Sequence, residues 1–244
     1  RIVDAGGPEA EARVAHDFNA ADISDLPFGW NLPNWLLCRE IVAHLATLPN
    51  VDFRPGVATA QLLTRAGEAR VTLSDGSRIA AKLVIGADGA RSNVAKQEVP
   101  GGDKIPYVIA YHEIIKAPGK IGSYDPARCD VIYDGKISPD FYGWVFPHGD
   151  SASVGMGTED PDVDLKQATA DLRAASGLTD CETIRKEGAP IPLKPMDRWD
   201  NGKDVVLAGD AAGVVAPSSG EGIFYAMVGG RVAATAAAAC LASG

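Results

Sequence analysis

The pattern of hydrophobic and polar positions predicts two segments in which a buried strand leads through a glycine turn into a helix. A run of apolar residues at 205–208 predicts a buried strand, and the small residues at 209–222 predict a tight turn. The Ala-rich segment that begins near Ile223 then predicts a helix. The same order occurs earlier, where a strand at 82–86 leads through residues 87–92 into a helix that ends near residue 98.

Elsewhere in the chain, apolar residues recur either at the helical period of 3.6 or at the strand period of two. Apolar residues at a helical period predict helices at 34–48 and 162–176, and Asp75-Gly76 predicts a hairpin turn at 74–77. Residues 1–25 are expected to form one or two short edge strands, 27–33 a loop and 148–150 a turn. Further strands are predicted at 51–53, 57–64, 69–73, 78–80, 107–116, 128–133, 141–147, 152–158 and 181–190.

The turn at 209–222 has residues suited to binding a flat, anionic ligand. Gly220 and Gly222 carry no Cβ atom, so that a ligand can approach the backbone, and the start of the helix adds free N–H groups. Asp210, just after the strand, can accept hydrogen bonds from the hydroxyls of a ribose or ribityl group. The alternative is a plain strand-to-helix connection in which the Asp caps a helix.

Three aromatic residues in the predicted strand at 141–147 lie two positions apart. Tyr142, Trp144 and Phe146 therefore point to one face, where they could wall a long apolar pocket or fill an ordinary sheet core. No residue is predicted to be catalytic. His148, in a predicted turn, is a candidate proton donor, although a histidine in a turn is usually only solvated, and His44 is expected to be a packed or surface residue.

Composition narrows the possible functions. The 244 residues carry a formal net charge of −9, which argues against nucleic acid as the main partner. Four widely spaced cysteines indicate neither a zinc site nor a disulfide framework and are typical of a reducing compartment. No signal peptide or membrane span is expected, because the apolar run at 223–242 is rich in small residues and contains Arg231. Membrane association through a surface patch stays open.

Two motifs resemble those of a known class of flavoproteins. The run GDAAGVVAPSSGEGIFYAM, which begins at Gly209, resembles the flavin motif of FAD-dependent oxidoreductases of the p-hydroxybenzoate hydroxylase type, and more narrowly the geranylgeranyl reductase family. This resemblance implies that Asp210 binds the ribityl chain and that the turn with Pro217, Gly220 and Gly222 lies beside the isoalloxazine ring. The run GADGARS resembles the Asp-Gly motif of the same class, and implies that Asp88 and Gly89 back the flavin pyrophosphate.

A third motif resembles the substrate side of the same reductases. It consists of Tyr142, Trp144, Phe146 and Pro147, followed by Gly155 and Gly157, and its resemblance implies an isoprenoid site. The first 95 or so residues instead resemble the FAD hydroxylases of ubiquinone biosynthesis, in the runs RIVDAGG, FGWNLPNWLL and LVIGADG.

The resemblance implies an α/β fold, with a Rossmann-type FAD-binding domain and an antiparallel substrate-binding sheet. The GxGxxG unit that should begin such a fold does not occur in the sequence. We expect substrate-side strands at 1–25, part of the FAD-binding domain at 26–100, the substrate-binding domain at 101–195 and the rest of the FAD-binding domain at 196–244, in a discontinuous layout.

The expected activity is hydride transfer from reduced FAD to isoprenoid C=C bonds, of geranylgeranyl diphosphate or of a geranylgeranylated (bacterio)chlorophyll, with NADPH as the reductant. The expected location is cytoplasmic or peripheral at the inner or photosynthetic membrane. One alternative is an FAD-dependent aromatic hydroxylase of ubiquinone biosynthesis. Another is a truncated, non-catalytic fragment that does not bind FAD.

Overall fold

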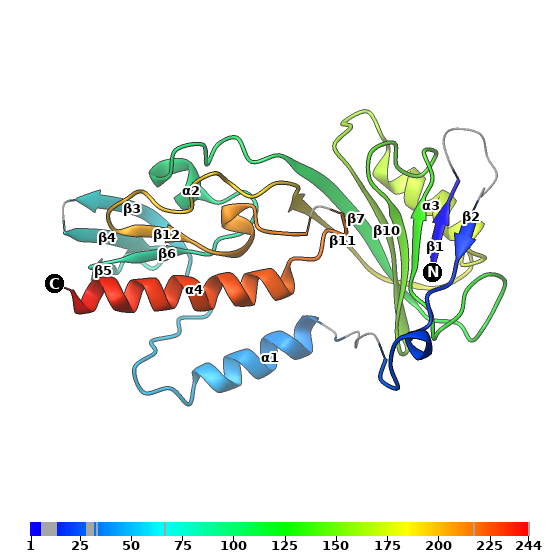
Figure 1. Ribbon diagram of the computed structural model, residues 1–244, viewed down its shortest axis with the longest axis horizontal. Helices are drawn as coiled ribbons and strands as arrows, with labels where there is room; N and C mark the ends of the chain where they lie inside the picture. The colour runs from blue at the N-terminus through cyan, green and yellow to red at the C-terminus, as the bar shows by residue number, and fades with distance from the viewer. Residues whose placement is uncertain (6–13, 28–31, 33, 66, 217, 244) are drawn as a thin grey trace. The chain divides into compact units, whose positions relative to one another are not determined.

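The strands of the described residues form three β-sheets, divided between two units (Figure 1). The computed structural model describes residues 1–244 except 6–13, 28–31, 33, 66, 217 and 244. Unit 1 comprises residues 1–51 and 108–189, and unit 2 comprises residues 52–107 and 190–244. The domain limits expected from the sequence stay a prediction, because a compact unit need not coincide with a ligand-binding domain.

A seven-stranded, mainly antiparallel sheet dominates unit 1. Its order is β11-β7-β10-β9-β8-β1-β2, and only the β1–β8 pair is parallel among the pairs with a described register. The strands are β1 (Ile2–Asp4), β2 (Val14–His16), β7 (Tyr107–Lys116), β8 (Asp130–Tyr133), β9 (Gly143–His148), β10 (Ser151–Thr158) and β11 (Thr183–Pro192). The prediction of a turn at 148–150 is wrong by one residue, because His148 pairs with Ser151 and ends β9.

The hydrophobic core of unit 1 lies between this sheet and α3 (Leu165–Ala175). Alternate residues of the strands point to the helix, because side chains in a strand project to opposite faces. Val145 of β9 and Met156 of β10 pack in one cluster with Leu172 of α3. The carboxylate of Asp164 begins the helix by accepting hydrogen bonds from the first free N–H groups. The predicted helix at 162–176 is therefore confirmed apart from its ends.

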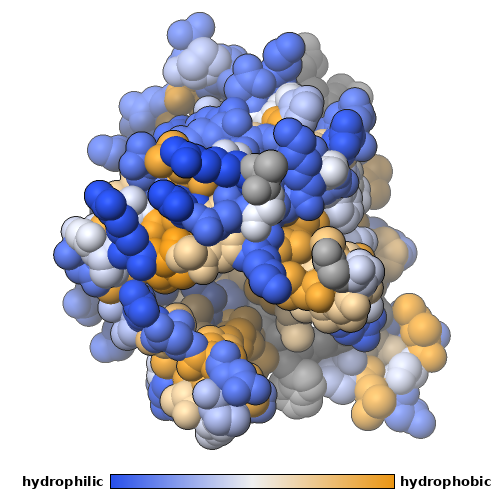
Figure 2. Space-filling view, turned by 90° about the vertical axis from the view of Figure 1, so that its left-hand side faces the viewer, coloured by the Kyte–Doolittle hydropathy of each residue, from blue (hydrophilic) through white to orange (hydrophobic). Residues whose placement is uncertain are grey.

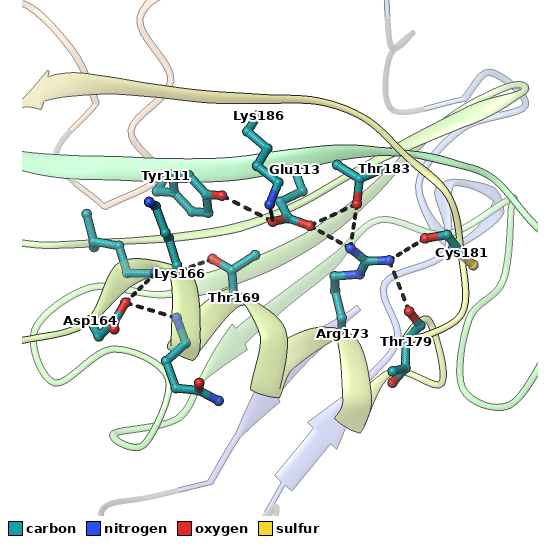
Figure 3. A network of polar contacts seen from close by, with 12 residues as sticks. Tyr111, Glu113, Asp164, Lys166, Thr169, Arg173, Thr179, Cys181, Thr183 and Lys186 are labelled. Atoms are coloured by element: carbon teal, nitrogen blue, oxygen red, sulfur yellow. Dashed lines mark hydrogen bonds and ion pairs between the residues drawn. The ribbon is translucent and has the colours of Figure 1, made fainter.

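A buried ion pair fixes α3 to the sheet (Figure 3). Arg173 Nη1 of α3 lies 2.5 Å from Glu113 Oε2 of β7, and both side chains are about 90% buried. Lys186, Tyr111 and Thr183 also donate to Glu113. Burial raises the pKa of Glu113, but the hydrogen bonds from Arg173 and the other donors outweigh it and hold that pKa below its usual value. The charged pair is therefore the stable form.

Unit 1 also contains α1 (Asn34–Leu45) and the short 3₁₀ helix η1 (Ala20–Asp22). α1 buries none of its residues, and it stops three residues before the predicted end at Leu48. Part of the expected loop at 27–33 lies outside the described residues.

Unit 2 combines a small parallel sheet with an antiparallel one. The parallel sheet consists of β6 (Val84–Gly86) and β12 (Val205–Leu207), and the antiparallel sheet of β3 (Thr59–Arg65), β4 (Glu68–Leu73) and β5 (Arg78–Ala81). The predicted turn at 74–77 is confirmed, since Asp75 Oδ1 accepts the Ser77 N–H and Gly76 has φ +84°. The predicted strand at 51–53 is wrong: Val51 and Phe53 are exposed and pair with no strand among the described residues.

The described part of unit 2 also contains α2 (Asn93–Glu98), the 3₁₀ helix η2 (Gly209–Ala212) and α4 (Ile223–Ala242). α4 is long and apolar enough to cross a membrane by length and composition alone, and it buries little of its surface. Hydrophobic patches interrupt the polar surface on the face that carries the end of α4 (Figure 2). The large exposed apolar residues of α4 are Ile223, Phe224, Tyr225, Met227, Val232 and Leu241.

Candidate functional site

The parallel pairing of β6 and β12 brings the two acidic-glycine motifs to one edge of the small sheet. Leu207 is the register partner of Gly86, and the Ala208 N–H donates to the Gly86 carbonyl at 2.9 Å. Asp88 follows the end of β6 by two residues, and Asp210 follows the end of β12 by three. The carboxyl ends of parallel strands are where α/β sheets bind ligands. Two residues about 120 positions apart in sequence therefore share this edge.

Asp88 has a structural role at this edge. Its Oδ1 accepts from the Ser92 hydroxyl at 2.5 Å, and its Oδ2 accepts from the N–H groups of Asn93 at 2.8 Å and Val94 at 3.2 Å. Ser92 in turn caps α2 by accepting from the Ala95 N–H. The carboxylate is thus committed to the start of α2, and we expect it to support a ligand by holding that turn in place.

The carboxylate of Asp210, unlike that of Asp88, has no hydrogen-bond partner among the described residues. The Asp210 side chain is half-buried in η2. Burial raises the pKa of Asp210 above its usual value, since no opposite charge or donor compensates the loss of water. An unpartnered, half-buried carboxylate is an open acceptor site, and it fits the hydroxyls of a ribityl or ribose group.

The glycines beside Asp210 permit the tight path of the turn. Gly209 has φ +62° and Gly220 has φ +66°, which other residues rarely adopt. A Cβ at Gly222 would lie 3.0 Å from Val215 Cγ1 and 3.3 Å from Asp210 Oδ1, so a side chain there would crowd the acceptor site. Gly89 has φ +85° with open space beside it. Pro217, also predicted to contact the flavin, lies outside the described residues.

The start of α4 already has an anionic partner from its own chain. Glu221 Oε1 accepts the Phe224 N–H at 2.9 Å, which satisfies one of the free donors of the first turn. That N–H group is therefore not free to bind a ligand, and Asp210 and the glycine turn stay the candidate binding groups at this edge.

On unit 1, the three predicted aromatic residues form a row along β9, on the face opposite to α3. The ring centroids of Tyr142 and Trp144 are 6.0 Å apart, and those of Trp144 and Phe146 are 6.2 Å apart with nearly parallel planes. Tyr142 and Trp144 are more than 90% buried, and burial raises the pKa of Tyr142 to about 12. The prediction that these residues share one face is confirmed. We call Tyr142, Trp144 and Phe146 the aromatic row.

Two glycines of β10 leave room for aromatic rings next to this strand. A Cβ at Gly155 would lie 2.7 Å from Trp144 Cζ2 and 2.4 Å from His112 Cβ, and one at Gly157 would lie 2.9 Å from Phe141 Cδ1. Their structural role is thus to let rings lie flat on the strand. Pro147 lies three positions after Trp144 on β9, so its side chain points to the opposite face of the sheet. That is the α3 face, where its register partner Ala152 packs, and Pro147 is therefore not part of the aromatic row.

Sequence reasoning missed a polar chain beside the aromatic row. His112 Nδ1 lies 2.8 Å from Ser153 Oγ, which also accepts the Trp144 Nε1–H at 3.0 Å, and His112 Nε2 lies 3.0 Å from Glu187 Oε2. The signal in the sequence was a histidine within the apolar strand YVIAYHEIIK. His148, the predicted candidate donor, has a buried Nδ1 without a partner among the described residues, and burial lowers its pKa.

A pocket of about 190 Å³ lies elsewhere in unit 2 and contains none of the predicted site residues. It is lined by Pro100, Gly101, Lys104, Ile105, Pro106, Lys194, Pro195, Met196 and Asp197. Within the part of the chain that the structure describes, no group of three or more His, Cys, Asp or Glu residues could hold a metal ion.

Comparisons with known proteins agree with the motifs. The chain is 72% identical over 163 residues to a geranylgeranyl diphosphate reductase of Rhodobacter capsulatus. The matched segment is 67% of this chain and 41% of that protein. A geranylgeranyl bacteriochlorophyll reductase-like protein of Thermoplasma acidophilum has a similar structure, with a TM-score of 0.67 at 23% identity over 77% of this chain and 49% of that chain. No protein-family model matches.

A second similar structure is the p-nitrophenol 4-monooxygenase of Pseudomonas putida, with a TM-score of 0.56 at 20% identity over 75% of this chain and 49% of that chain. The α/β fold expected from the flavoprotein motifs is therefore confirmed, as is the resemblance to the geranylgeranyl reductase family. The chain spans about two fifths of the length of the curated relative. The resemblance of the first 95 residues to ubiquinone-pathway hydroxylases stays a prediction.

Proposed function

We propose that this chain, a relative of the geranylgeranyl diphosphate reductases, is part of an FAD-dependent oxidoreductase that reduces isoprenoid C=C bonds. The observation that carries the proposal is the unpartnered Asp210 carboxylate at the edge that it shares with Asp88. The reductase names of the relatives support the same activity.

The residues at this edge fit the ribityl portion of a flavin. Asp210 would accept hydrogen bonds from its hydroxyls, and the turn with Pro217, Gly220 and Gly222 would lie against the ring. Gly209 permits the turn, while Asp88 and Gly89 would hold the neighbouring loop in place through the cap of α2. When bound, FAD supplies a hydride, and the chain supplies position and water exclusion.

The aromatic row would hold the prenyl chain of the substrate. The row of rings is apolar, and an isoprene chain has no polar group that would lose a hydrogen bond on contact with it. Gly155 leaves the space that the Trp144 ring occupies, and Gly157 leaves space for the Phe141 ring next to the row. The substrate class that we propose is a long branched alkene such as a geranylgeranyl group, on a diphosphate or on a (bacterio)chlorophyll, and the name of the 72% identical relative supports the diphosphate.

The electron donor and the location complete the proposal. NADPH is proposed as the reductant that restores the flavin. A cytoplasmic protein that associates peripherally with the inner or photosynthetic membrane would meet such a substrate, and the exposed apolar residues of α4 support a surface contact of this kind. No nucleic acid is proposed as a partner, in keeping with the acidic net charge.

Two alternatives predict different observations. An aromatic hydroxylase would oxidise NADPH with uptake of oxygen and release a hydroxylated ring, and its fold would be the same. A non-catalytic fragment would bind no FAD, and its purified form would show no flavin spectrum. The reductase name of the 72% identical relative favours isoprenoid reduction over both.

A substitution in the aromatic row tests the proposal. Trp144→Ala should weaken binding of geranylgeranyl diphosphate at least tenfold in calorimetry, while the flavin content stays unchanged. The matched control is Trp35→Ala, since Trp35 lies on α1 with 58% of its surface exposed. Equal loss of flavin and prenyl binding in Trp144→Ala, or no prenyl binding by the unmodified protein, would contradict the assignment.

A further inference from the structure

The pocket in unit 2 has two walls, and each wall contributes one lysine. One wall is the loop 100–106, which carries Lys104, and the other is the segment 194–197, which begins with Lys194. All the residues that line the pocket belong to unit 2, so the pocket is described by that unit alone. We call it the two-lysine pocket.

The charged groups of the two-lysine pocket are not paired within the protein. The side chains of Lys104, Lys194 and Asp197 make no hydrogen bond or ion pair with any residue that the structure describes. A lysine ammonium carries three donors and no acceptor, so the donors of both lysines are open to a ligand. Two ammonium groups and one carboxylate leave the lining positive, in a chain whose formal net charge is −9.

The backbone joins the two walls and fixes their spacing. The Leu193 N–H donates to the Pro106 carbonyl at 2.9 Å, which connects the start of one wall to the end of the other. The Met196 N–H donates to the Ala212 carbonyl at 2.9 Å and attaches the second wall to η2. Three of the lining residues are prolines, whose rings fix φ. A ligand therefore has to order only side chains, which lowers the cost of binding.

The loop with Lys104 is also held from behind by α2. The Gly102 N–H donates to the Val99 carbonyl at 3.0 Å, and Gly102 lies so close to the Ala95 carbonyl that a Cβ would not fit. Gly101 has φ +87°, and its carbonyl accepts the Lys104 N–H at 3.0 Å. The loop is thus packed against the helix along its length.

The size of the two-lysine pocket limits what it can hold. A cavity of about 150 Å³ accepts a molecule the size of benzene, whereas pockets for whole drug-sized ligands measure about 300–1,000 Å³. A pocket of about 190 Å³ therefore fits one compact group, and the rest of a larger molecule would lie outside. A phosphate or diphosphate group is compact, presents mainly acceptor oxygens and pairs with lysine as a point charge.

Other classes of ligand fit the lining less well. A cation would meet two ammonium groups and one carboxylate, and an apolar ligand would cover Lys104 and Lys194 without pairing their charges. A planar carboxylate is matched best by the fork of an arginine, and none of the described residues that line the pocket is an arginine.

We propose that the two-lysine pocket binds a phosphate or diphosphate group. Lys104 and Lys194 donate to it from the two walls, and Asp197 is a like charge that limits the affinity. The pocket contains neither Asp88 nor Asp210, and the inference goes beyond the proposed function without resting on it. The free anion, a prenyl diphosphate and a nucleotide share this chemistry.

Titration of the purified chain with inorganic diphosphate tests the site. Sodium chloride keeps the ionic strength constant, because salt screens exposed charges. In ¹H–¹⁵N NMR spectra, the amides of Gly101, Lys104, Ile105 and Met196 should shift in one saturable transition, with a Kd of about 1 mM or lower. A drift without saturation, or saturable shifts that leave these amides unchanged, would overturn the proposal.

Substitutions of the charged residues test their roles. Lys104→Gln and Lys194→Gln should each weaken diphosphate binding about three- to tenfold, since each removes a charged donor. Asp197→Asn should instead strengthen it about two- to fivefold, because repulsion of the anion is lost. Lys82→Gln is the matched control, since Lys82 is an exposed lysine of the same unit outside the pocket.

The control separates a site from general attraction between charges. The affinity of Lys82→Gln for diphosphate should equal that of the unmodified protein. An equal loss in Lys82→Gln and Lys104→Gln, or unchanged affinity when Lys104→Gln and Lys194→Gln are combined, would overturn the proposal. Circular dichroism checks that each variant is folded, and because the lysines are exposed we expect no change.

Competition for the same amide shifts identifies the source of the group. The probes are inorganic diphosphate, geranyl diphosphate and ADP. Equal affinity of all three supports the site as one for the free anion, and tighter binding of geranyl diphosphate or of ADP supports it as one for a prenyl diphosphate or a nucleotide. If none of the three moves these amides, the proposal is overturned, while the proposed function, which depends on FAD and prenyl binding, is unaffected.

Discussion

The amide of Ala208 donates a hydrogen bond to the carbonyl oxygen of Gly86 at 2.9 Å. This bond continues the parallel pairing of β12 with β6 past the last paired residue, so the two strands end together. Because the acidic-glycine motifs follow these ends, Asp88 and Asp210 are brought to one edge, although about 120 residues separate them. The two carboxylates then differ in use: Asp88 is committed to α2, and Asp210 is left open.

The commitment of Asp88 leads to a stability prediction. Asp88→Ala should lower the free energy of unfolding by about 1–2 kcal/mol, because the first N–H groups of α2 lose their acceptor. Urea denaturation measures the effect. Asp103→Ala, at an exposed aspartate of the same unit, should change the stability by less than about 0.5 kcal/mol. An equal effect at both positions would contradict the capping role.

The close contacts at Gly155 predict a large effect of one added methyl group. Gly155→Ala places a Cβ within 2.7 Å of both His112 and Trp144 and 2.5 Å from the Tyr111 carbonyl, so the strand or the indole must move. We expect a loss of about 1–3 kcal/mol, together with changed Trp fluorescence. Gly119→Ala is the control, since no atom lies within 4 Å of its Cβ and its φ is not positive. Unchanged fluorescence in Gly155→Ala would contradict the packing of Trp144.

The buried pair of Glu113 and Arg173 predicts that removal of one charge is costly. Glu113→Gln leaves the Arg173 guanidinium buried with fewer acceptors, and should lower the free energy of unfolding by about 3 kcal/mol. The Arg39–Glu40 pair of α1 serves as the control, because both side chains are about 60% exposed and Glu40→Gln should cost less than about 1 kcal/mol. Thermal or urea unfolding of both variants checks the difference.

The lowered pKa values of His112 and His148 predict a loss of stability in mild acid. Burial is the main cause of both shifts, so the unfolded chain takes up these protons more readily than the folded one. Stability from these groups is fully present above their unfolded pKa of about 6.5 and is lost as the pH falls through and below that value. Denaturation midpoints measured between pH 5 and 7.5 test this.

A double variant, His112→Gln with His148→Gln, is the matched comparison. Its stability should depend less on pH over the same range, because neither side chain can take up a proton. An identical pH dependence in the unmodified protein and the double variant would show that other groups cause the loss.

Local patterns in the sequence predicted most of the elements, because each depends on neighbouring residues. The ten-residue strand β7 was predicted with its exact bounds, and Asp75-Gly76 with its turn. Residues 51–53 have the composition of a strand, but a strand also needs a partner, which sequence patterning does not specify. The sequence predicts that His148 lies in a turn with Gly149 and Asp150, yet its backbone pairs with Ser151.

The predicted site residues depended on motifs and on the period of two in a strand. That period placed Tyr142, Trp144 and Phe146 together correctly. It also separates Pro147 from them, which the motif alone does not reveal. His112, Ser153 and Glu187 were missed because each comes from a different strand, and only the order of strands in the sheet brings them into contact.

Titration of the purified protein with FAD tests the central claim, that the open carboxylate of Asp210 binds the flavin, most directly. We predict that the unmodified protein binds FAD and that Asp210→Asn binds it at least about tenfold more weakly, since a hydrogen bond to a charged acceptor contributes about 1.5–3 kcal/mol. Without FAD, Asp210→Asn should be the more stable protein at neutral pH, because burial raises the pKa of Asp210 and the ionised form is disfavoured. Equal affinity of both proteins for FAD, or no binding by the unmodified protein, would contradict the account.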